Sequence, residues 1–377
     1  MKFGSKLIHN GNEIDQTTGA LSIPIYQTST YHQSDIDHPG EYDYSRSGNP
    51  TRKALEDTIA QLEGGVRGFA FASGMAATSS VLSIFSEGDH IVVCEDLYGG
   101  TYRITTTFFH RFGIQITFVD ASDLDAIKKS IRENTKAIFL ESPSNPLLKV
   151  TDLKGAVAIA REHKLLTIID NTFMSPYLQR PLALGIDIVI HSATKFIGGH
   201  SDVIAGLVVV KDADLAKRIY AVQNGFGAVL GPQDSWLLLR GLKTLKVRLD
   251  YQQATAQKLA QWLEKHPKIQ RVYYLGLDSH PHKALHLGQS DGAGAVLSFE
   301  TVEEATAKSF MKQVKMAAVA VSLGGVETIA SYPVKMSHAA IPREERERLG
   351  ITDRLIRVSV GLEDIEDLIE DFDRALQ

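Results

Sequence analysis

Cysteine and clustered positive charge are nearly absent from this sequence. Its one cysteine, Cys94, excludes an intramolecular disulfide, and the apolar run HIVVCED around it predicts a buried core thiol. The 40 Lys and Arg residues are outnumbered by 45 Asp and Glu residues, which gives a net charge of -5. Because the balance is acidic and the basic residues form no stripe, we expect no nucleic-acid partner and favour a small zwitterionic ligand.

Long apolar runs are also missing. The N-terminus, MKFGSKLIHN, lacks the apolar core of a signal peptide, and no stretch approaches the ~18 apolar residues of a membrane span. We therefore expect a cytoplasmic protein with no membrane partner. Neither a Walker loop nor a G-x-G-x-x-G follows an early strand, so a nucleotide cofactor has no comparable signal.

The length of 377 residues predicts two domains. From residue 67 to residue 210, short apolar runs alternate with helical patterns: GFAFAS, HIVVCED, IQITFVD, KAIFLES, LLTIID, DIVIHS and AGLVVV. Because these runs are almost continuously apolar, they favour parallel strands buried by helices on both faces. We predict a large, mostly parallel α/β domain over residues 46–235.

The flanking regions have different patterns. Residues 1–45 are polar and without a sustained period, which predicts an arm that packs on something else, in an oligomer a neighbouring subunit. After the large domain, a helical stretch from Pro232 to Lys265 leads into the strand-like runs IQRVYYL, AVLSFE, AAVAVSL and LIRVSVG. These runs alternate with the helical segments EEATAKSFMKQVK and IEDLIEDFDRALQ, so residues 236–377 predict a smaller α+β domain.

Two apolar runs break into polar residues at their carboxyl ends, LTIIDNT at Asp170 to Thr172 and DIVIHSATK at Lys195. Ligands of open α/β sheets bind just outside such strand ends. Taken singly, Asp170 could be a helix cap and Lys195 a solvated lysine. Together they offer the amine that forms an imine with pyridoxal 5'-phosphate (PLP) and the anion that keeps its pyridine nitrogen protonated.

Two elements could bind the phosphate of such a cofactor. Ser192 and Thr194 place hydroxyls beside the amine of Lys195, and in FASGMAATSS a strand ends at Ser73 before Gly74 and a helix that begins around Met75. The free N–H groups of a helix N-terminus form an anion site by geometry. Ordinary turns are the alternative explanation for both elements.

The order of these motifs resembles the Cys/Met metabolism family of PLP enzymes, which includes cystathionine γ-synthase, γ-lyase and β-lyase. The resemblance covers almost the whole chain and implies the aspartate aminotransferase-like fold type I of PLP-dependent transferases. The matching motifs are YSRSGNPTR at 44–52, FASGMAA at 71–77, DLYGGTYR at 96–103, ESPSNP at 141–146, DNTF at 170–173, HSATK at 191–195, GG at 198–199, SLGGVE at 322–327 and IRVSVGLE at 356–363.

The resemblance implies a role for each matching residue. Lys195 is expected to carry PLP as a Schiff base and then to shuttle protons, while Asp170 pairs with the pyridinium nitrogen, with Thr172 also in contact with the cofactor. The phosphate is expected to be bound by residues of this chain together with two residues from an adjacent subunit: Gly74, Met75, Ser192 and Thr194, and in trans Tyr44 and Arg46. A dimer would then be the smallest active unit, and a tetramer is usual in the family.

Further residues are expected to contact the substrate or the cofactor ring. Tyr98 should stack over the ring and serve as an acid–base group. Arg357 should clamp the substrate carboxylate through a two-pronged hydrogen-bond pair, because a charged residue inside LIRVSV needs a buried partner. The positions expected beside it are Asn145, Ser322 and Val321.

The carbon that loses its sulfur is the open point. Many γ-acting relatives carry a glutamate where this chain has Val321, which favours β-elimination, whereas YSRSGNPTR looks more like the γ-synthase and γ-lyase branch. Gly100 stands where methionine γ-lyases have a cysteine, which argues against that specificity. We predict a cystathionine lyase with β-cleavage slightly ahead of γ-cleavage or mixed activity.

Other functions are alternatives to a lyase. One is γ-replacement, as in a cystathionine γ-synthase or an O-acyl-homoserine sulfhydrylase, and another is a non-catalytic amino-acid sensor with the PLP fold. The histidines at 280, 282 and 286 suggest a metal, but no Cys or carboxylate cluster accompanies them. We interpret them as a histidine-rich surface loop and expect no metal site.

Overall fold

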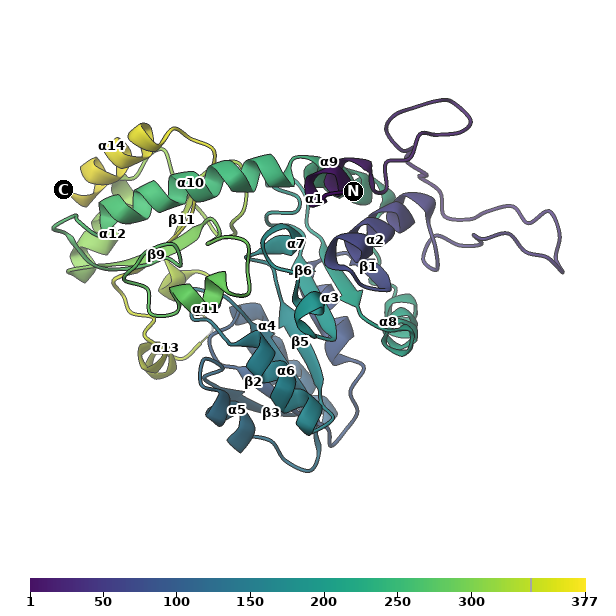
Figure 1. Ribbon diagram of the computed structural model, residues 1–377, viewed down its shortest axis with the longest axis horizontal. Helices are drawn as coiled ribbons and strands as arrows, with labels where there is room; N and C mark the ends of the chain where they lie inside the picture. Colours follow the sequence, from purple (N-terminus) through teal and green to yellow (C-terminus); the bar gives the residue numbers. More distant parts are fainter. Residues whose placement is uncertain (340) are drawn as a thin grey trace.

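The computed structural model describes residues 1–339 and 341–377, and a seven-stranded sheet lies at its centre (Figure 1). The spatial order is β1-β7-β6-β5-β4-β2-β3. Each of the seven apolar runs forms one strand, as predicted. The strands are β1 (Arg67–Phe71), β2 (His90–Cys94), β3 (Gln115–Val119), β4 (Thr135–Glu141), β5 (Leu166–Asp170), β6 (Ile188–Ser192) and β7 (Gly206–Val210).

One strand of this sheet runs against the expected direction. β7 pairs antiparallel with both β1 and β6, whereas the pairs among β2 to β6 are parallel. The prediction of a parallel strand for AGLVVV was therefore wrong. Residues 193–205, which join β6 to β7, form turns rather than a crossover helix, so the chain returns in the opposite direction. Lys195 lies in this connection.

Helices cover both faces of the large sheet. Strand β7 can therefore be apolar throughout, because both of its faces are buried. Val208 and Val210 pack in one core with residues of α3 and α8, whereas Leu207 and Val209 pack in the other with residues of α2 and α9. The helices around this sheet are α2 (Pro50–Glu63), α3 (Gly74–Leu82), α4 (Gly99–Arg103), α5 (Leu124–Lys129), α6 (Leu153–Glu162), α7 (Ser175–Leu178), α8 (Ala213–Phe226) and α9 (Pro232–Lys243).

A second, five-stranded sheet follows, in the order β10-β11-β12-β9-β8. Its strands are β8 (Ile269–Tyr273), β9 (Val296–Thr301), β10 (Ala318–Val319), β11 (Ile329–Ser331) and β12 (Leu355–Ser359). Its helices are α10 (Leu245–Leu263), α11 (Lys283–Leu287), α12 (Glu304–Gln313), α13 (Arg343–Leu349) and α14 (Ile365–Leu376). Phe310 packs edge-on against Phe299 and Phe372, with ring centroids 5.5 and 4.9 Å apart, so α12 and α14 are anchored in one core with the sheet.

Two predicted elements of this part differ in extent. The stretch from Pro232 to Lys265 forms two helices, α9 and α10, with Thr244 between them in a non-helical conformation. AAVAVSL forms only the two-residue strand β10, and a few residues later Ser322 and Gly324 adopt left-handed backbone conformations. Those residues turn toward the large sheet.

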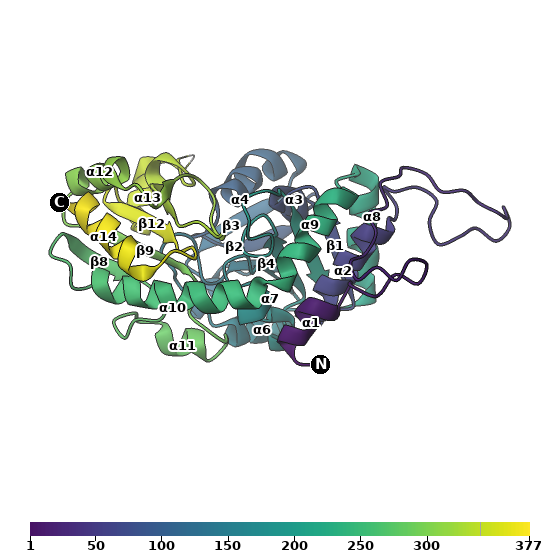
Figure 2. The ribbon, with the colours of Figure 1, turned by 90° about the horizontal axis from the view of Figure 1, so that it is seen from above.

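The predicted N-terminal arm begins with a short helix. Residues Phe3–His9 form helix α1, which contacts α2 and α9 of the same chain and buries Leu7. The bounds of the arm at residues 1–45 stay a prediction. The chain between α1 and α2 extends away from both sheets in the two views (Figures 1 and 2). Its contact with a neighbouring subunit stays a prediction.

The burial of Cys94 agrees with the sequence, whereas the burial of two histidines does not. Cys94 is buried, as predicted. His286, which was expected on an exposed loop, lies in α11, is fully buried and donates from Nε2 to Gly292 O at 2.8 Å; His280 is buried as well. Within residues 1–339 and 341–377, no group of three or more His, Cys, Asp and Glu is arranged to hold a metal. Every helix in the same ranges is too short or too polar to cross a bilayer.

The close packing of α9 on the loop after Lys195 gives a stability prediction. A Cβ added at Gly241 would lie 2.5 Å from Gly198 O and 2.6 Å from Ile197 O. Since both atoms are backbone, Gly241→Ala must push the helix and the loop apart, and overpacking of this kind costs about 1–3 kcal/mol. We expect a lower thermal unfolding midpoint, measured by circular dichroism.

Gly225 in α8 offers a matched control, because a Cβ added there meets nothing within 4 Å. Gly225→Ala should leave the midpoint unchanged or raise it, since alanine favours a helix over glycine by about 1 kcal/mol. Equal midpoints for the two variants would contradict the proposed packing constraint.

Candidate active site

A cavity of about 450 Å³ opens at the carboxyl edge of the large sheet and is closed on its other side by residues from the second sheet. This volume is in the usual range for small-molecule sites. Apart from Tyr44 and Arg46, every residue that the sequence singled out for the site lines it. They are Gly74, Met75, Tyr98, Asn145, Asp170, Thr172, Ser192, Thr194, Lys195, Val321, Ser322 and Arg357.

Neighbouring parallel strands bring the carboxylate and the amine to this edge. Asp170 is the last residue of β5 and pairs in register with Ile190 of β6, and Lys195 follows β6 by three residues. Burial raises the pKa of Asp170, while hydrogen bonds from Thr172 and the positive charge of Lys195 act in the opposite direction. A cationic ligand group beside Asp170 would therefore stabilise its ionised form.

Thr172 joins the ends of these two strands. Its hydroxyl donates to Asp170 Oδ1 and accepts from Ser192 N at 2.8 Å, and its own backbone N donates to Asp170 Oδ1 at 3.0 Å. The orientation of the carboxylate is thus coupled to the position of β6. Thr172 therefore makes three hydrogen bonds where the two strands end.

The N-terminus of α3 lies directly against the end of β6. A Cβ added at Gly74 would come within 2.9 Å of both Cβ and Oγ of Ser192, so only glycine allows this approach. Ser73 caps the helix by accepting from Ala76 N at 3.0 Å. The hydroxyl of Thr194 accepts from Ala205 N at 3.0 Å. Helix N-terminus and hydroxyls therefore converge on one side of the cavity, an arrangement suited to an anion.

The amine of Lys195 is held from the second sheet. Its Nζ donates to Ser322 Oγ at 2.6 Å, and burial, reinforced by the charge of Arg357, lowers the pKa of Lys195 to about 8. Ser322 has φ of 89°, a conformation that costs a non-glycine residue energy and is concentrated at functional sites. Gly324, with φ of 80°, packs on the backbone of Lys195 and Phe196, where a Cβ would lie 2.5 Å from Phe196 N.

Arg357 lies on β12, fully enclosed except toward the cavity. Its Nη1 donates to Asn145 Oδ1 at 2.9 Å and its Nη2 to Ser322 O at 2.8 Å and Ser331 Oγ at 3.2 Å. Burial lowers its pKa to about 10, which still leaves the guanidinium charged at neutral pH. Among the described residues, Arg357 Nε is a buried donor with no acceptor. Such an atom points to a ligand, and a carboxylate is the acceptor that an arginine fork matches.

Tyr98 is the N-cap residue of α4 at the cavity rim, with 42% of its surface exposed. Its backbone N donates to Glu141 Oε2 at 2.9 Å. Gly100 lies under the tyrosine ring, and a Cβ there would clash with the ring and come within 2.9 Å of Met75 Sδ. Glycine at position 100 is therefore needed for this placement of the ring, whatever it implies about specificity.

Glu141 is a carboxylate of the cavity wall that the sequence did not lead us to predict. It ends β4, pairs in register with Asp170 and lines the cavity while almost fully buried. Burial and the neighbouring charge of Asp170 raise its pKa well above the usual range. Its place at the end of KAIFLE, the strand next to LTIID, is a signal that could have identified it, because strand ends of a parallel sheet share one edge.

Tyr44 and Arg46 are not brought to the cavity of their own chain. Both belong to the extended segment before α2, where Arg46 Nη1 donates to Asn224 O at 2.7 Å and to Asn224 Oδ1 at 3.0 Å. The guanidinium of Arg46 also lies over the Tyr44 ring, 5.5 Å from its centroid. Their expected contribution to the cavity of a neighbouring subunit stays a prediction.

The fold and the cavity together define an enzyme class. A largely buried amine of lowered pKa, a carboxylate whose pKa is raised by burial, an anion-binding helix N-terminus and an enclosed arginine fit a phosphorylated aldehyde cofactor and an amino-acid carboxylate. Pyridoxal 5'-phosphate carries an aldehyde, a ring nitrogen and a phosphate. The amine, the carboxylate and the helix N-terminus of the cavity match these three groups.

Comparison with known proteins agrees with this chemistry. Residues 4–377 match the model of the Cys/Met metabolism PLP-dependent enzyme family, and the chain belongs to that family. It is 57% identical over 373 residues to cystathionine β-lyase MetC of Bacillus subtilis (99% of this chain, 96% of that protein) and 51% identical over 377 residues to cystathionine γ-lyase of the same organism (100% of each).

A solved structure extends the similarity to the fold. The crystal structure of cystathionine γ-lyase from Lactobacillus plantarum complexed with L-serine is 48% identical, with a TM-score of 0.97 over 100% of this chain and 98% of that chain. The predicted family and fold class are therefore confirmed, and the family assignment confirms PLP as the cofactor.

Thr172 gives a prediction about cofactor affinity. Thr172→Val removes the hydroxyl that orients Asp170 and leaves Ser192 N without its acceptor, whereas Thr172→Ser keeps both bonds. A lost hydrogen bond to a charged group is worth about 1.5–3 kcal/mol, so we expect PLP affinity to fall at least about ten-fold in the valine variant. Fluorescence titration of cofactor-free protein measures this, and equal affinities for the two variants would exclude the orienting role.

Arg357 gives a prediction about substrate recognition. Arg357→Lys keeps the positive charge but loses the planar fork, so the Michaelis constant for an amino-acid substrate should rise about ten-fold or more. Arg354→Lys, just before the same strand, is a suitable control because Arg354 pairs with Gln270 outside the cavity. An unchanged Michaelis constant in Arg357→Lys would refute the carboxylate clamp.

Proposed function

We propose that this protein is a PLP-dependent lyase that cleaves a C–S bond of L-cystathionine and related sulfur amino acids, with β-cleavage slightly ahead of γ-cleavage. The observation that carries the proposal is the meeting of Lys195, Asp170 and Arg357 in one cavity. The names of the similar proteins support the substrate, because relatives above 50% identity are called cystathionine β-lyases and a cystathionine γ-lyase.

The roles of the residues follow from their contacts. When bound, PLP supplies an electron sink that stabilises negative charge at the substrate Cα. Asp170, oriented by Thr172, would hold the ring nitrogen in its protonated form, and Gly74, Met75, Ser192 and Thr194 would hold the phosphate. Lys195, with its lowered pKa, is suited to removing the Cα proton near neutral pH.

Substrate orientation depends on the second sheet. Arg357 would bind the α-carboxylate through the donor that lacks a protein acceptor, and Asn145 keeps the guanidinium in place. Ser322 holds the amine of Lys195 nearby. Tyr98, at the rim, would cover the cofactor ring and offer a phenol for proton transfer.

Val321 supports the preference for β-cleavage. It lines the cavity with 63% of its surface exposed, beside Ser322. Cleavage at Cγ requires an additional proton removal at Cβ, and an isopropyl group can neither accept nor orient a proton. The relative named cystathionine γ-lyase, 51% identical over the full length, keeps γ-cleavage as the second candidate.

Assembly is part of the proposal. We infer that the segment carrying Tyr44 and Arg46 completes the phosphate site of a neighbouring subunit, which makes a dimer the active unit and a tetramer the expected assembly. The polar composition of this segment and its extended course in Figures 1 and 2 support the idea. We also propose that the chain divides into an arm and two domains at residues 45 and 235, and that the protein is cytoplasmic.

Product analysis with L-cystathionine tests the reaction. β-Cleavage with water gives homocysteine, pyruvate and ammonia, and γ-cleavage gives cysteine, 2-oxobutyrate and ammonia. We expect the first set to predominate and both to disappear in Lys195→Ala. Predominant γ-replacement, in which cysteine is added to an activated homoserine, would contradict the lyase assignment. Protein that binds PLP but forms neither product set would favour an amino-acid sensor.

The role of position 321 has its own test. Val321→Glu places a carboxylate at the cavity wall and should raise the fraction of 2-oxobutyrate among the products, because that group can assist the second proton removal. Val321→Gln introduces a side chain of the same size as glutamate but without its charge, so it should keep the wild-type ratio of the two product sets. Identical ratios in the two variants would remove the argument for β-cleavage from this residue.

A further inference from the structure

One wall of the cavity belongs to neither sheet. Met336 and Ser337 line it, and they follow the 3-10 turn Pro333–Lys335. Ser337 O lies directly against the backbone of Gly99, where a Cβ would overlap it. The wall therefore contacts the turn at Gly99, and this turn places Tyr98 on the opposite side of the cavity.

The next residue connects this wall to the substrate-orienting groups. His338 is buried, and its Nε2 donates to Asn145 O at 3.0 Å while its Nδ1 accepts from Ser337 Oγ at 2.8 Å. Burial lowers the pKa of His338 to about 4, so the ring is neutral under physiological conditions and this pattern of one donor and one acceptor is maintained. Since Asn145 also bonds Arg357, a shift of the wall would reach the arginine.

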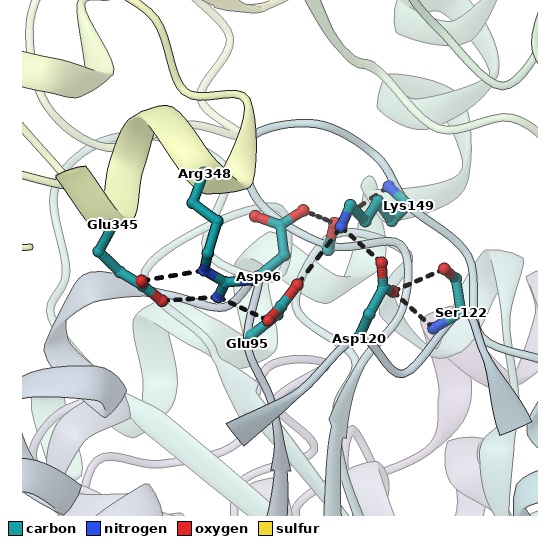
Figure 3. A network of polar contacts seen from close by, with 8 residues as sticks. Glu95, Asp96, Asp120, Ser122, Lys149, Glu345 and Arg348 are labelled. Carbon is teal, nitrogen blue, oxygen red and sulfur yellow. Dashed lines mark hydrogen bonds and ion pairs between the residues drawn. The ribbon is translucent and has the colours of Figure 1, made fainter. Parts of the chain in front are cut away.

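The far end of the wall is fixed by α13. Arg346, on this helix, donates from Nη1 to Val334 O, which couples the helix to the turn before Met336. Arg348, also on α13, donates from Nη2 to Glu95 Oε2 and to Glu345 Oε1, each at 2.7 Å, as Figure 3 shows. Glu95 is the residue directly after β2, three positions before Tyr98.

The contact between Arg348 and Glu95 is more than an isolated surface ion pair. Only 10% of the Glu95 side chain is exposed, and Lys149 approaches it at 3.7 Å while donating to Asp120 at 2.9 Å (Figure 3). Arg348 itself is held in orientation by a second bond, from Nε to Glu345 at 3.0 Å. Networks with an oriented arginine are the case in which a partly exposed pair contributes measurably.

We propose that Arg348 is a positioning residue for substrate recognition. By holding α13 against the end of β2, it sets the position of the Met336–Ser337 wall, and through His338 it steadies Asn145 and Arg357. Arg348 touches neither the cavity nor the groups assigned to the cofactor, so its effect falls on the Michaelis constant for the amino acid rather than on the chemical step or on PLP affinity.

The test replaces Arg348 by methionine, which keeps the length of the side chain and removes its charge. Breaking a pair worth about 1 kcal/mol corresponds to about a five-fold change, so the Michaelis constant for L-cystathionine should rise about five-fold with kcat within about two-fold of wild type. Affinity for PLP should be unchanged, and amide hydrogen exchange of residues 333–339 should accelerate.

Arg343→Met is the matched control. Arg343 lies on the same helix and pairs with Glu347 and, at 3.7 Å, with Asp353 rather than with the residue after β2, so both constants and the exchange rates should equal those of wild type. In addition, Arg348→Met combined with Glu95→Gln should raise the Michaelis constant no further than Arg348→Met alone, because the Arg348–Glu95 contact is already broken and Lys149 keeps its 2.9 Å bond to Asp120.

Three results would overturn the inference: an unchanged Michaelis constant in Arg348→Met, an equal change in Arg343→Met, or a parallel loss of PLP affinity. The kinetic part rests on the proposed function, whereas hydrogen exchange does not. If wild-type protein fails to cleave L-cystathionine, the proposed function fails, and unchanged exchange of residues 333–339 in Arg348→Met then decides against the positioning role.

Discussion

The burial of the Lys195 amine is the constraint on which the rest of the site depends. An amine removed from water is destabilised in its charged form, and here burial and the charge of Arg357 act together to lower its pKa to about 8. The same burial requires hydrogen-bond partners, which Ser322 provides from the second sheet. A reactive amine therefore exists only when both sheets are assembled around it.

Close backbone contacts around Lys195 explain several of the glycine-containing motifs. Gly74 allows α3 to meet Ser192, Gly241 allows α9 to meet the loop after Lys195, and Gly324 allows the turn after β10 to pass over Phe196. Each contact would be closed to any residue with a Cβ, apart from local shifts. The motifs FASGMAA and SLGGVE thus describe how two of these three segments converge on the lysine.

The sequence predicted the large sheet well because its strands are apolar on both faces. All seven runs became strands, and the break into polar residues located Asp170 and Lys195 at one edge. The direction of β7 was not predictable from composition, because a buried antiparallel strand is as apolar as a parallel one. The small strands of the second sheet were harder to predict, since β10 covers only Ala318–Val319 and the chain turns toward the cavity soon after it, at Ser322 and Gly324.

By itself, the sequence determined the family, the cofactor and most of the residues around the cavity, because their spacing along the chain is enough to identify them. Only the tertiary structure decided which groups meet. It placed Glu141 beside Asp170, left Arg357 Nε as a buried donor with no acceptor among the residues that the structure describes, and joined Arg348 to Glu95 across 253 positions of the chain. Contacts of this kind depend on how two sheets pack, and neither periodicity nor motif spacing carries that information.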